Sequence, residues 1–178
     1  MDMSTGMIRP VEPRDIAAIT QIYAHHVLHG FATFEIEPPT AEEMERRMHV
    51  TLDRGFPYLV AEREGEVAGY AYAGPYRTRP GYRFTVENSV YVRTDTVRQG
   101  TGRMLMHALI AECARRGFCR MVAVIGDSAN IASIRLHESV GFNPVGILRS
   151  VGFKFGRWVD TVLMQRELTG EIEWTPTP

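Results

Sequence analysis

The chain has 178 residues, of which 44% are hydrophobic and 23% charged, as expected of one globular domain. Its formal net charge of −1 argues against a nucleic-acid or acidic-membrane partner, so we expect small-molecule partners. Its apolar runs fall short of the ~20 residues of a membrane span, and the N-terminus lacks the basic-then-apolar order of a signal peptide. We therefore expect a cytoplasmic protein.

The first third of the chain predicts one short strand and two helices. Residues 8–11 suit a strand, and apolar residues recur at helical spacing over residues 14–30. The run Thr40-Ala41-Glu42-Glu43 has the form of a capping box and predicts a second helix that ends at Gly55. The aromatic segment 30–35 between them is either a lid or substrate wall, or a loop packed on the core.

Residues 57–73 predict an antiparallel hairpin that turns at Glu64-Gly65. The following segment, 74–83, is broken by proline and glycine and is rich in arginine. Such a loop either holds an anion or is simply a solvated face. Its arginines are Arg77, Arg79 and Arg83.

Residues 85–92 form a β-branched and aromatic run that predicts a central strand. After a short polar loop, Gly100-Thr101-Gly102 precedes the amphipathic segment 104–116, which predicts a helix. The first amides of a helix lack internal partners, and its dipole favours phosphate there, with Arg98 and Arg103 adding positive charge. The pattern predicts a pyrophosphate site, although Gly-x-Gly also serves ordinary tight turns.

The last third predicts a buried strand at 121–125, a helix from Asn130 to Gly141, and strands at 142–147 and 158–166. A loop containing Gly152, Lys154 and Gly156 is expected between these two strands. The order is strand, two helices, three strands, helix, strand, helix and two strands. We therefore predict a single α/β (α+β) domain over residues 1–168 and a flexible tail at 169–178.

Several runs resemble the GCN5-related N-acetyltransferase (GNAT) superfamily. Residues 130–142, NIASIRLHESVGF, are similar to its Asn-x-x-Ser-x-x-Leu-Tyr-x-x-x-Gly-Phe helix, with His137 in the tyrosine position. Gly100 and Gly102 match its Gln/Arg-x-x-Gly-x-Gly/Ala loop, although Val97 replaces the first Gln/Arg. The chain also resembles the phosphinothricin and methionine sulfoximine acetyltransferase branch of this superfamily. This resemblance is carried by His137, the run TVENSVYV and residues 152–160.

The resemblance, over residues 8–168, implies a mixed, mostly antiparallel sheet flanked by helices. It also implies acetyl transfer from acetyl-CoA to the α-amine of L-phosphinothricin, L-methionine sulfoximine or L-methionine sulfone. Asn130 and Ser133 belong to the expected acetyl-CoA site but could instead cap their helix. The acetyl-CoA site is expected to comprise Val90, Tyr91, Val92, Arg98, Gln99, Gly100, Thr101, Gly102, Arg103, Asn130 and Ser133.

Two residues are candidates for proton transfer. An α-amine must lose a proton before it attacks the thioester, and Glu87 is the expected base, directly or through a water. The alternative for Glu87 is a surface strand glutamate. His137 is expected to protonate the leaving thiolate or position substrate, or else to be an interior hydrogen-bonded histidine. Backbone N–H groups between Val90 and Val92 are the expected oxyanion donors.

The branch's substrates carry a carboxylate and a tetrahedral polar group, which favour cationic and N–H donors. Lys154 is a secondary candidate for the anionic end. The chemistry needs no metal, and Cys113 and Cys119 form no C-x-x-C, so we predict neither a metal site nor a disulfide. The expected acceptor site comprises Phe34, Arg77, Thr78, Arg79, Glu87, Asn88 and Ser89.

Two other functions remain open at this point. The acceptor could be a polyamine, an aminoglycoside or a protein N-terminus, but the first two favour clustered carboxylates where this loop carries arginines. The chain could also be a CoA-binding module without catalysis. The resemblance further implies a homodimer, for which the aromatic residues Phe153, Phe155 and Trp158 suit the interface, unless they pack within the monomer.

Overall fold

The computed structural model describes residues 6–168, and the predicted order of elements is confirmed there. The predicted tail, 169–178, lies outside the described residues. The elements are β1 (Met7–Pro10), α1 (Ile16–His29), α2 (Ala41–Asp53), β2 (Tyr58–Arg63), β3 (Glu66–Pro75), β4 (Thr85–Val92), α3 (Thr101–Arg115), β5 (Arg120–Gly126), α4 (Ile131–Ser139), β6 (Asn143–Lys154) and β7 (Arg157–Glu167).

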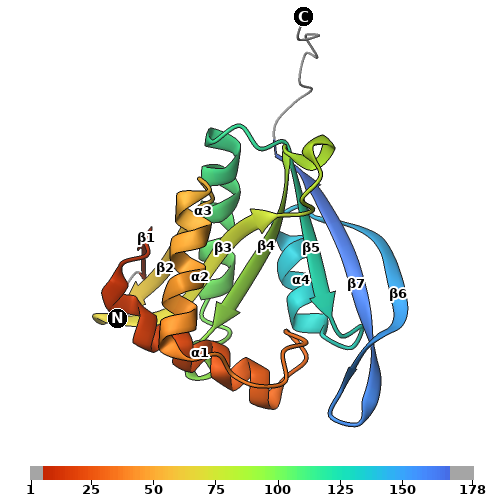
Figure 1. Ribbon diagram of the computed structural model, residues 1–178, viewed down its shortest axis with the longest axis horizontal. Helices are drawn as coiled ribbons and strands as arrows, with labels where there is room; N and C mark the ends of the chain where they lie inside the picture. The colour runs from red at the N-terminus through yellow and green to blue at the C-terminus, as the bar shows by residue number, and fades with distance from the viewer. Residues whose placement is uncertain (1–5, 169–178) are drawn as a thin grey trace, which may run out of the picture.

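The strands form one mixed sheet in the order β1-β2-β3-β4-β5-β7-β6. Among the described strands, β4 and β5 are the parallel pair and every other neighbouring pair is antiparallel, which confirms the predicted sheet. Helices α1 and α2 lie on one face and α3 and α4 on the other (Figure 1). The fold is therefore three layers, with β4 at the centre.

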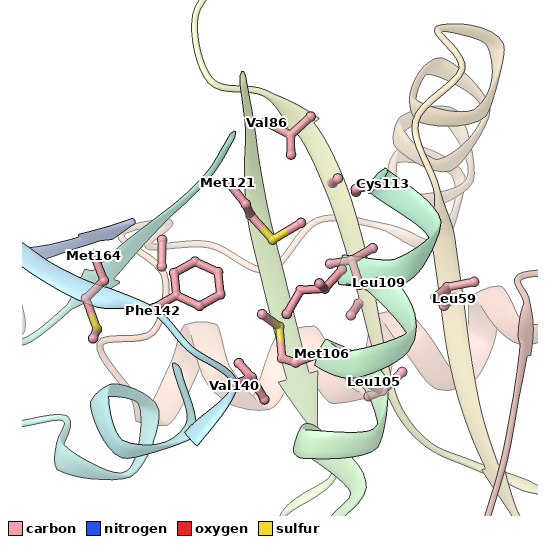
Figure 2. Packing of buried hydrophobic residues seen from close by; sticks show 14 of the residues in the cluster. Leu59, Val86, Leu105, Met106, Leu109, Cys113, Met121, Val140, Phe142 and Met164 are labelled. Carbon is pink, nitrogen blue, oxygen red and sulfur yellow. The ribbon is translucent and has the colours of Figure 1, made fainter. Parts of the chain in front are cut away.

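Helix α3 is held to the sheet by an apolar stripe at helical spacing. Its side chains point at buried residues of β4 and β5, and Phe142 and Met164 extend the same cluster toward β7 (Figure 2). Burying one such side chain contributes about 1.5–3 kcal/mol, so this cluster anchors the strand that precedes α3. The stripe comprises Leu105, Met106, Leu109 and Cys113, all 0% exposed.

The parallel pairing of β4 and β5 is short. It runs from Thr85, opposite Arg120, to Asn88, opposite Ala123, and the two strands then diverge toward their carboxyl ends (Figure 1). Strand β4 stays paired with β3 as far as Val92, whereas β5 stays paired with β7 as far as Gly126. Each strand therefore follows its antiparallel neighbour, and a gap opens between them.

Two predicted boundaries are wrong. Helix α3 begins at Thr101, three residues before the predicted start, because Gly100 adopts a positive φ of 82° and serves as its N-cap. Strand β6 continues to Lys154, through most of the predicted loop, because β7 pairs with it as far as Arg157. The register of β6 against β7 shifts next to Gly146 and Gly152, so the strand continues through glycines that usually indicate the end of a strand.

The segment 30–35 is packed against the β6–β7 hairpin, and its two phenylalanines lie outside both buried hydrophobic clusters, so the predicted alternative of a loop packed on the core is wrong. The buried Lys154 Nζ donates hydrogen bonds of 2.8 Å to the carbonyls of Gly30 and Thr33. Lys154 is therefore committed to this segment, and its prediction as a ligand for the anionic end of a substrate is wrong. The ring of Phe34 lies directly over Gly152, where a Cβ would come within 2.5 Å of it.

This close approach gives a test of the packing. We expect Gly152→Ala to lower the free energy of unfolding by about 1–3 kcal/mol, because the added methyl must displace the Phe34 ring. The matched control is Gly146→Ala in the same strand, where the added Cβ meets nothing within 4 Å. Urea unfolding measures both, and equal losses in the two variants would contradict the proposed contact.

Candidate active site

The divergence of β4 and β5 opens a cavity of about 230 Å³. It is lined by the end of β4, the end of β5, the first turns of α4 and the segment 31–34. The structure thus brings together residues that lie more than a hundred positions apart. The predicted site residues among its lining are Phe34, Glu87, Asn88, Ser89, Val90, Tyr91, Asn130, Ser133 and His137.

Alternation along β4 places its polar side chains on both faces of the sheet. Val86 belongs to the cluster under α3, and Tyr91 belongs to the cluster under α1. Because successive side chains point to opposite faces, Glu87 lies on the α1 face and Asn88 on the α3 face. The cavity is therefore lined from both sides of the sheet at the place where β4 and β5 separate.

Glu87 is the carboxylate of this cavity, and its side chain is half-buried. Burial raises its pKa above the ordinary value, and the charge of Arg77 opposes that rise. A carboxylate with a raised pKa is a stronger base than an exposed one. The geometry fits the predicted base and not a freely solvated surface glutamate.

His137 is 2% exposed and has both ring nitrogens in hydrogen bonds. Its Nδ1 lies 2.8 Å from the carbonyl oxygen of Ser133, and its Nε2 lies 2.9 Å from Asn88 Nδ2. Burial lowers the pKa of the imidazole, with the Ser133 carbonyl opposing. These contacts match the predicted interior, hydrogen-bonded histidine, and its role in proton transfer stays a prediction.

Asn130 performs the capping role that was its predicted alternative. Its Oδ1 accepts a hydrogen bond of 3.2 Å from the Ser133 backbone N–H, and its Nδ2 donates to the carbonyl of Gly126 at 3.2 Å. The side chain thereby satisfies a free amide at the start of α4 and ties that helix to the end of β5. Any contact of Asn130 with a ligand would come in addition to these bonds.

The predicted pyrophosphate loop lies beyond the cavity, at the carboxyl end of β4. Gly100 has the left-handed backbone conformation that turns the chain into α3, and Arg98 is also at positive φ, 64°. Gly102 serves a different purpose, because a Cβ there would lie 3.2 Å from Leu136 on α4. Because Gly102 has no side chain, α3 can approach α4 closely at this point.

The arginine-rich loop is only partly associated with the cavity. Arg77, Thr78 and Arg79 are exposed and are not among its lining residues. Arg77 stacks on the ring of Tyr76, with its guanidinium carbon 5.1 Å from the ring centroid, and its charge acts on Glu87. Of the three residues, Arg77 is therefore the one that the structure connects to the carboxylate.

Part of the cavity wall was missed by the sequence analysis. These residues come from β5 and β7, and the residues of β5 gave no chemical signal because they are apolar or glycine. Only the pairing of β5 with β7 brings Thr161 to the site. Phe31, Ala32 and Thr33 also line the cavity, as the predicted substrate wall in segment 30–35 required. The missed residues are Ala123, Val124, Ile125, Gly126 and Thr161.

Residues 6–168 contain no group of three His, Cys, Asp or Glu side chains arranged to hold a metal ion. Within the same range, no helix is long and apolar enough to cross a membrane.

Comparison with known proteins identifies the family. A family model described as an acetyltransferase (GNAT) domain matches residues 8–163. The phosphinothricin N-acetyltransferase of Alcaligenes faecalis is 55% identical over 161 residues, which cover 90% of this chain and 82% of that protein. The L-methionine sulfoximine/L-methionine sulfone acetyltransferase of Salmonella typhimurium is 44% identical, with coverage of 90% and 94%.

Solved structures agree with this match. A phosphinothricin acetyltransferase from Sinorhizobium meliloti in complex with AcCoA superposes with a TM-score of 0.92 and 42% identity, over 97% of this chain and 94% of that one. A ribosomal-protein-alanine N-acetyltransferase from Brucella melitensis gives a TM-score of 0.89 and 40% identity, over 91% and 99%. The chain therefore belongs to the GNAT acetyltransferase family, as its sequence motifs predicted.

Proposed function

We propose that this enzyme transfers the acetyl group of acetyl-CoA to the α-amine of a small amino-acid analogue, with Glu87 as the general base. The acceptors that fit best are L-phosphinothricin, L-methionine sulfoximine and L-methionine sulfone. The observation that carries the proposal is the half-buried Glu87 carboxylate in the β4–β5 cavity, with Arg77 beside it. The relatives named for these acceptors are 55% and 44% identical to this chain.

Glu87 supplies the base that this reaction requires. The acceptor enters as an ammonium ion and must lose a proton to become nucleophilic. The raised pKa of Glu87 brings its basicity closer to that of the amine, and the Arg77 charge opposes that rise. Attack then forms the C–N bond. As the C–S bond breaks, the nitrogen loses a second proton, and this proton neutralises the CoA thiolate that leaves.

The end of β4 supplies hydrogen-bond donors for the thioester oxygen. The Arg93 N–H bonds to the Ala68 carbonyl on the β3 side. Because amide direction alternates along a strand, the N–H groups of Val92 and Val90 point away from β3, toward the side where β5 has diverged. We assign stabilisation of the developing oxyanion to these two amides, with Val90 the nearer to Glu87.

The loop after β4 is the proposed binding site of the pyrophosphate. The amides that begin α3 have no helical partners, and the helix dipole favours an anion there. Arg98, Gln99 and Arg103 are exposed around Gly100. Gln99 accepts a hydrogen bond from Arg63, and Arg103 Nε lies 3.4 Å from His107 Nε2, so we assign the phosphates first to Arg98. The backbone amides at the start of α3 can hold the pyrophosphate even though Val97 replaces the usual Gln or Arg.

The acceptor lies between Glu87 and the wall formed by Phe34. We assign its carboxylate to Arg77, the cation whose charge acts on Glu87. Thr78 and Arg79 follow on the same exposed turn and come second as candidates. The similarity to a ribosomal-protein-alanine N-acetyltransferase favours a protein N-terminus as the second candidate acceptor.

We also propose a homodimer formed through the β6–β7 hairpin. Its outer side exposes large apolar side chains that a monomer would leave in water, including Val145 at 61% and Trp158 at 63% exposed. A concentration of exposed apolar side chains on one hairpin is typical of association sites. Sedimentation analysis of the protein measures the state directly. The other exposed members are Ile147, Leu148, Val151, Phe153 and Phe155.

The acceptor class is tested by CoA release, followed with a thiol reagent. The panel contains L-phosphinothricin, L-methionine sulfoximine, L-methionine sulfone, spermidine and a peptide with a free N-terminus. We expect turnover with the first three compounds. Turnover with only the peptide or spermidine would overturn the acceptor assignment and leave the acetyltransferase assignment in place.

Replacing the proposed base separates catalysis from binding. We expect Glu87→Gln to lower kcat by about 10²–10⁴-fold, because the acceptor loses its proton acceptor, while the Kd for acetyl-CoA is unchanged. In the wild type, kcat/KM should fall as pH drops through the raised pKa of Glu87. The variant should lack this acidic limb. Equal kcat values in the two proteins across pH would exclude Glu87 as the base.

Removing the neighbouring cation should have two effects. We expect Arg77→Ala to raise the amino-acid KM roughly tenfold or more, because the substrate carboxylate loses a charged partner. It should also move the acidic limb of kcat/KM to higher pH, because the charge that lowers the pKa of Glu87 is gone. Arg79→Ala is the matched control on the same turn, and an equal shift of its pH limb would argue against the assignment to Arg77.

A further inference from the structure

The contact between His137 and Asn88 joins α4 to β4 at the point where β4 and β5 separate. Asn88 is the last residue of β4 that pairs with β5, opposite Ala123. Its amide nitrogen lies 2.9 Å from His137 Nε2, and both side chains are more than nine-tenths buried. The contact therefore lies next to Glu87 and two residues before Val90.

The chemistry of the partners fixes the protonation of His137. The Ser133 carbonyl can only accept a hydrogen bond, so the Nδ1 at 2.8 Å from it carries the proton. The ring is buried against Phe142, with centroids 5.0 Å apart, and burial favours the neutral form. A neutral imidazole has one N–H, so Nε2 presents a lone pair.

This lone pair also fixes the orientation of the Asn88 amide. The oxygen and nitrogen of an asparagine amide are distinguished by their hydrogen bonds, and here Nε2 requires a donor. Asn88 must therefore turn its NH₂ group to His137. Its Oδ1 is left buried and without a hydrogen-bond partner in the described part of the chain.

The Asn88 amide is held from both helices in this orientation. Its Nδ2 lies 2.9 Å from His137 Nε2 on α4 and 3.6 Å from Met106 Sδ on α3. These two contacts fix the Asn88 side chain between α3 and α4.

We propose that His137 is a positioning residue that acts through Asn88, and that it gives no proton to the leaving thiolate. Its lone pair holds the last paired residue of β4, which sets the direction of Glu87 on one side and of the Val90 N–H on the other. The proton that reaches the sulfur is the one that the attacking nitrogen loses. The inference rests on the proposed function, because it assigns a role within the same acetyl transfer.

A double-mutant cycle tests whether His137 acts through Asn88. We expect His137→Phe to lower kcat by about 5–100-fold, the equivalent of about 1–3 kcal/mol for an unpaired buried amide. His137→Gln, whose carbonyl can accept from Asn88 but which cannot serve as an acid, should stay within about threefold of wild type. In an Asn88→Ala background, His137→Phe should cause no further loss of kcat.

A general acid would give the opposite pattern. His137→Gln would then lose as much kcat as His137→Phe, about 10²–10⁴-fold, and both would keep that loss in the Asn88→Ala background. Either result would overturn the proposal. Because all the variants keep Glu87, each should retain the acidic limb of kcat/KM.

The wild-type protein provides a test that needs neither a variant nor an acceptor. Nitrogen NMR of the histidine rings, in the free protein and in its complex with acetyl-CoA, reports which nitrogen of His137 carries a proton. We expect the neutral Nδ1–H form at neutral pH and above in both. A protonated Nε2 would overturn the inference, whereas absence of turnover across the acceptor panel would overturn only the proposed function.

Discussion

The site depends on the place where β4 and β5 stop pairing. Each strand is tied along its length to an antiparallel neighbour, β4 to β3 and β5 to β7, and the two pairings lead them in different directions. After Asn88 and Ala123, the backbone amides of β4 have no partner on β5, and the gap between the strands is deep enough to form a cavity. In the interior of a sheet, unpaired amides would be costly. Here they are the groups that a thioester and its pantetheine arm can use.

The alternation of side chains along β4 divides the chemistry between the two faces of the sheet. Glu87 lies on the face that carries the segment after α1, where burial raises the pKa of its carboxyl and the charge of Arg77 opposes that rise. Asn88 lies on the opposite face, where the buried environment of His137 favours a neutral imidazole. The cavity therefore presents a carboxylate from one face of the sheet and uncharged polar groups from the other.

The sequence predicted what local chemistry determines. The periodic apolar residues of α1, the capping threonine before α2 and the β-branched run of β4 each specify their element without help from distant residues, and all three were found. Glu87 and His137 could be singled out because the motifs around them are specific. The wrong predictions for the β6–β7 region concern structure that depends on tertiary pairing. The local sequence around Gly152 and Lys154 predicts a loop, but pairing with β7 makes both residues part of β6. Lys154 then donates hydrogen bonds to the carbonyls of Gly30 and Thr33.

The same reasoning explains why the role of His137 needed the structure. In the sequence, a histidine in the place of a tyrosine differs mainly in its pKa, which suggests an acid. Because Nδ1–H of His137 donates a hydrogen bond to the Ser133 carbonyl, Nε2 of the neutral ring can only accept a hydrogen bond, and it faces the Asn88 amide. A hydroxyl in that position could donate a proton to sulfur, whereas this imidazole has none free to give. In the proposed reaction, the substitution changes the role of α4 from a source of protons to a support for the strand that carries Glu87.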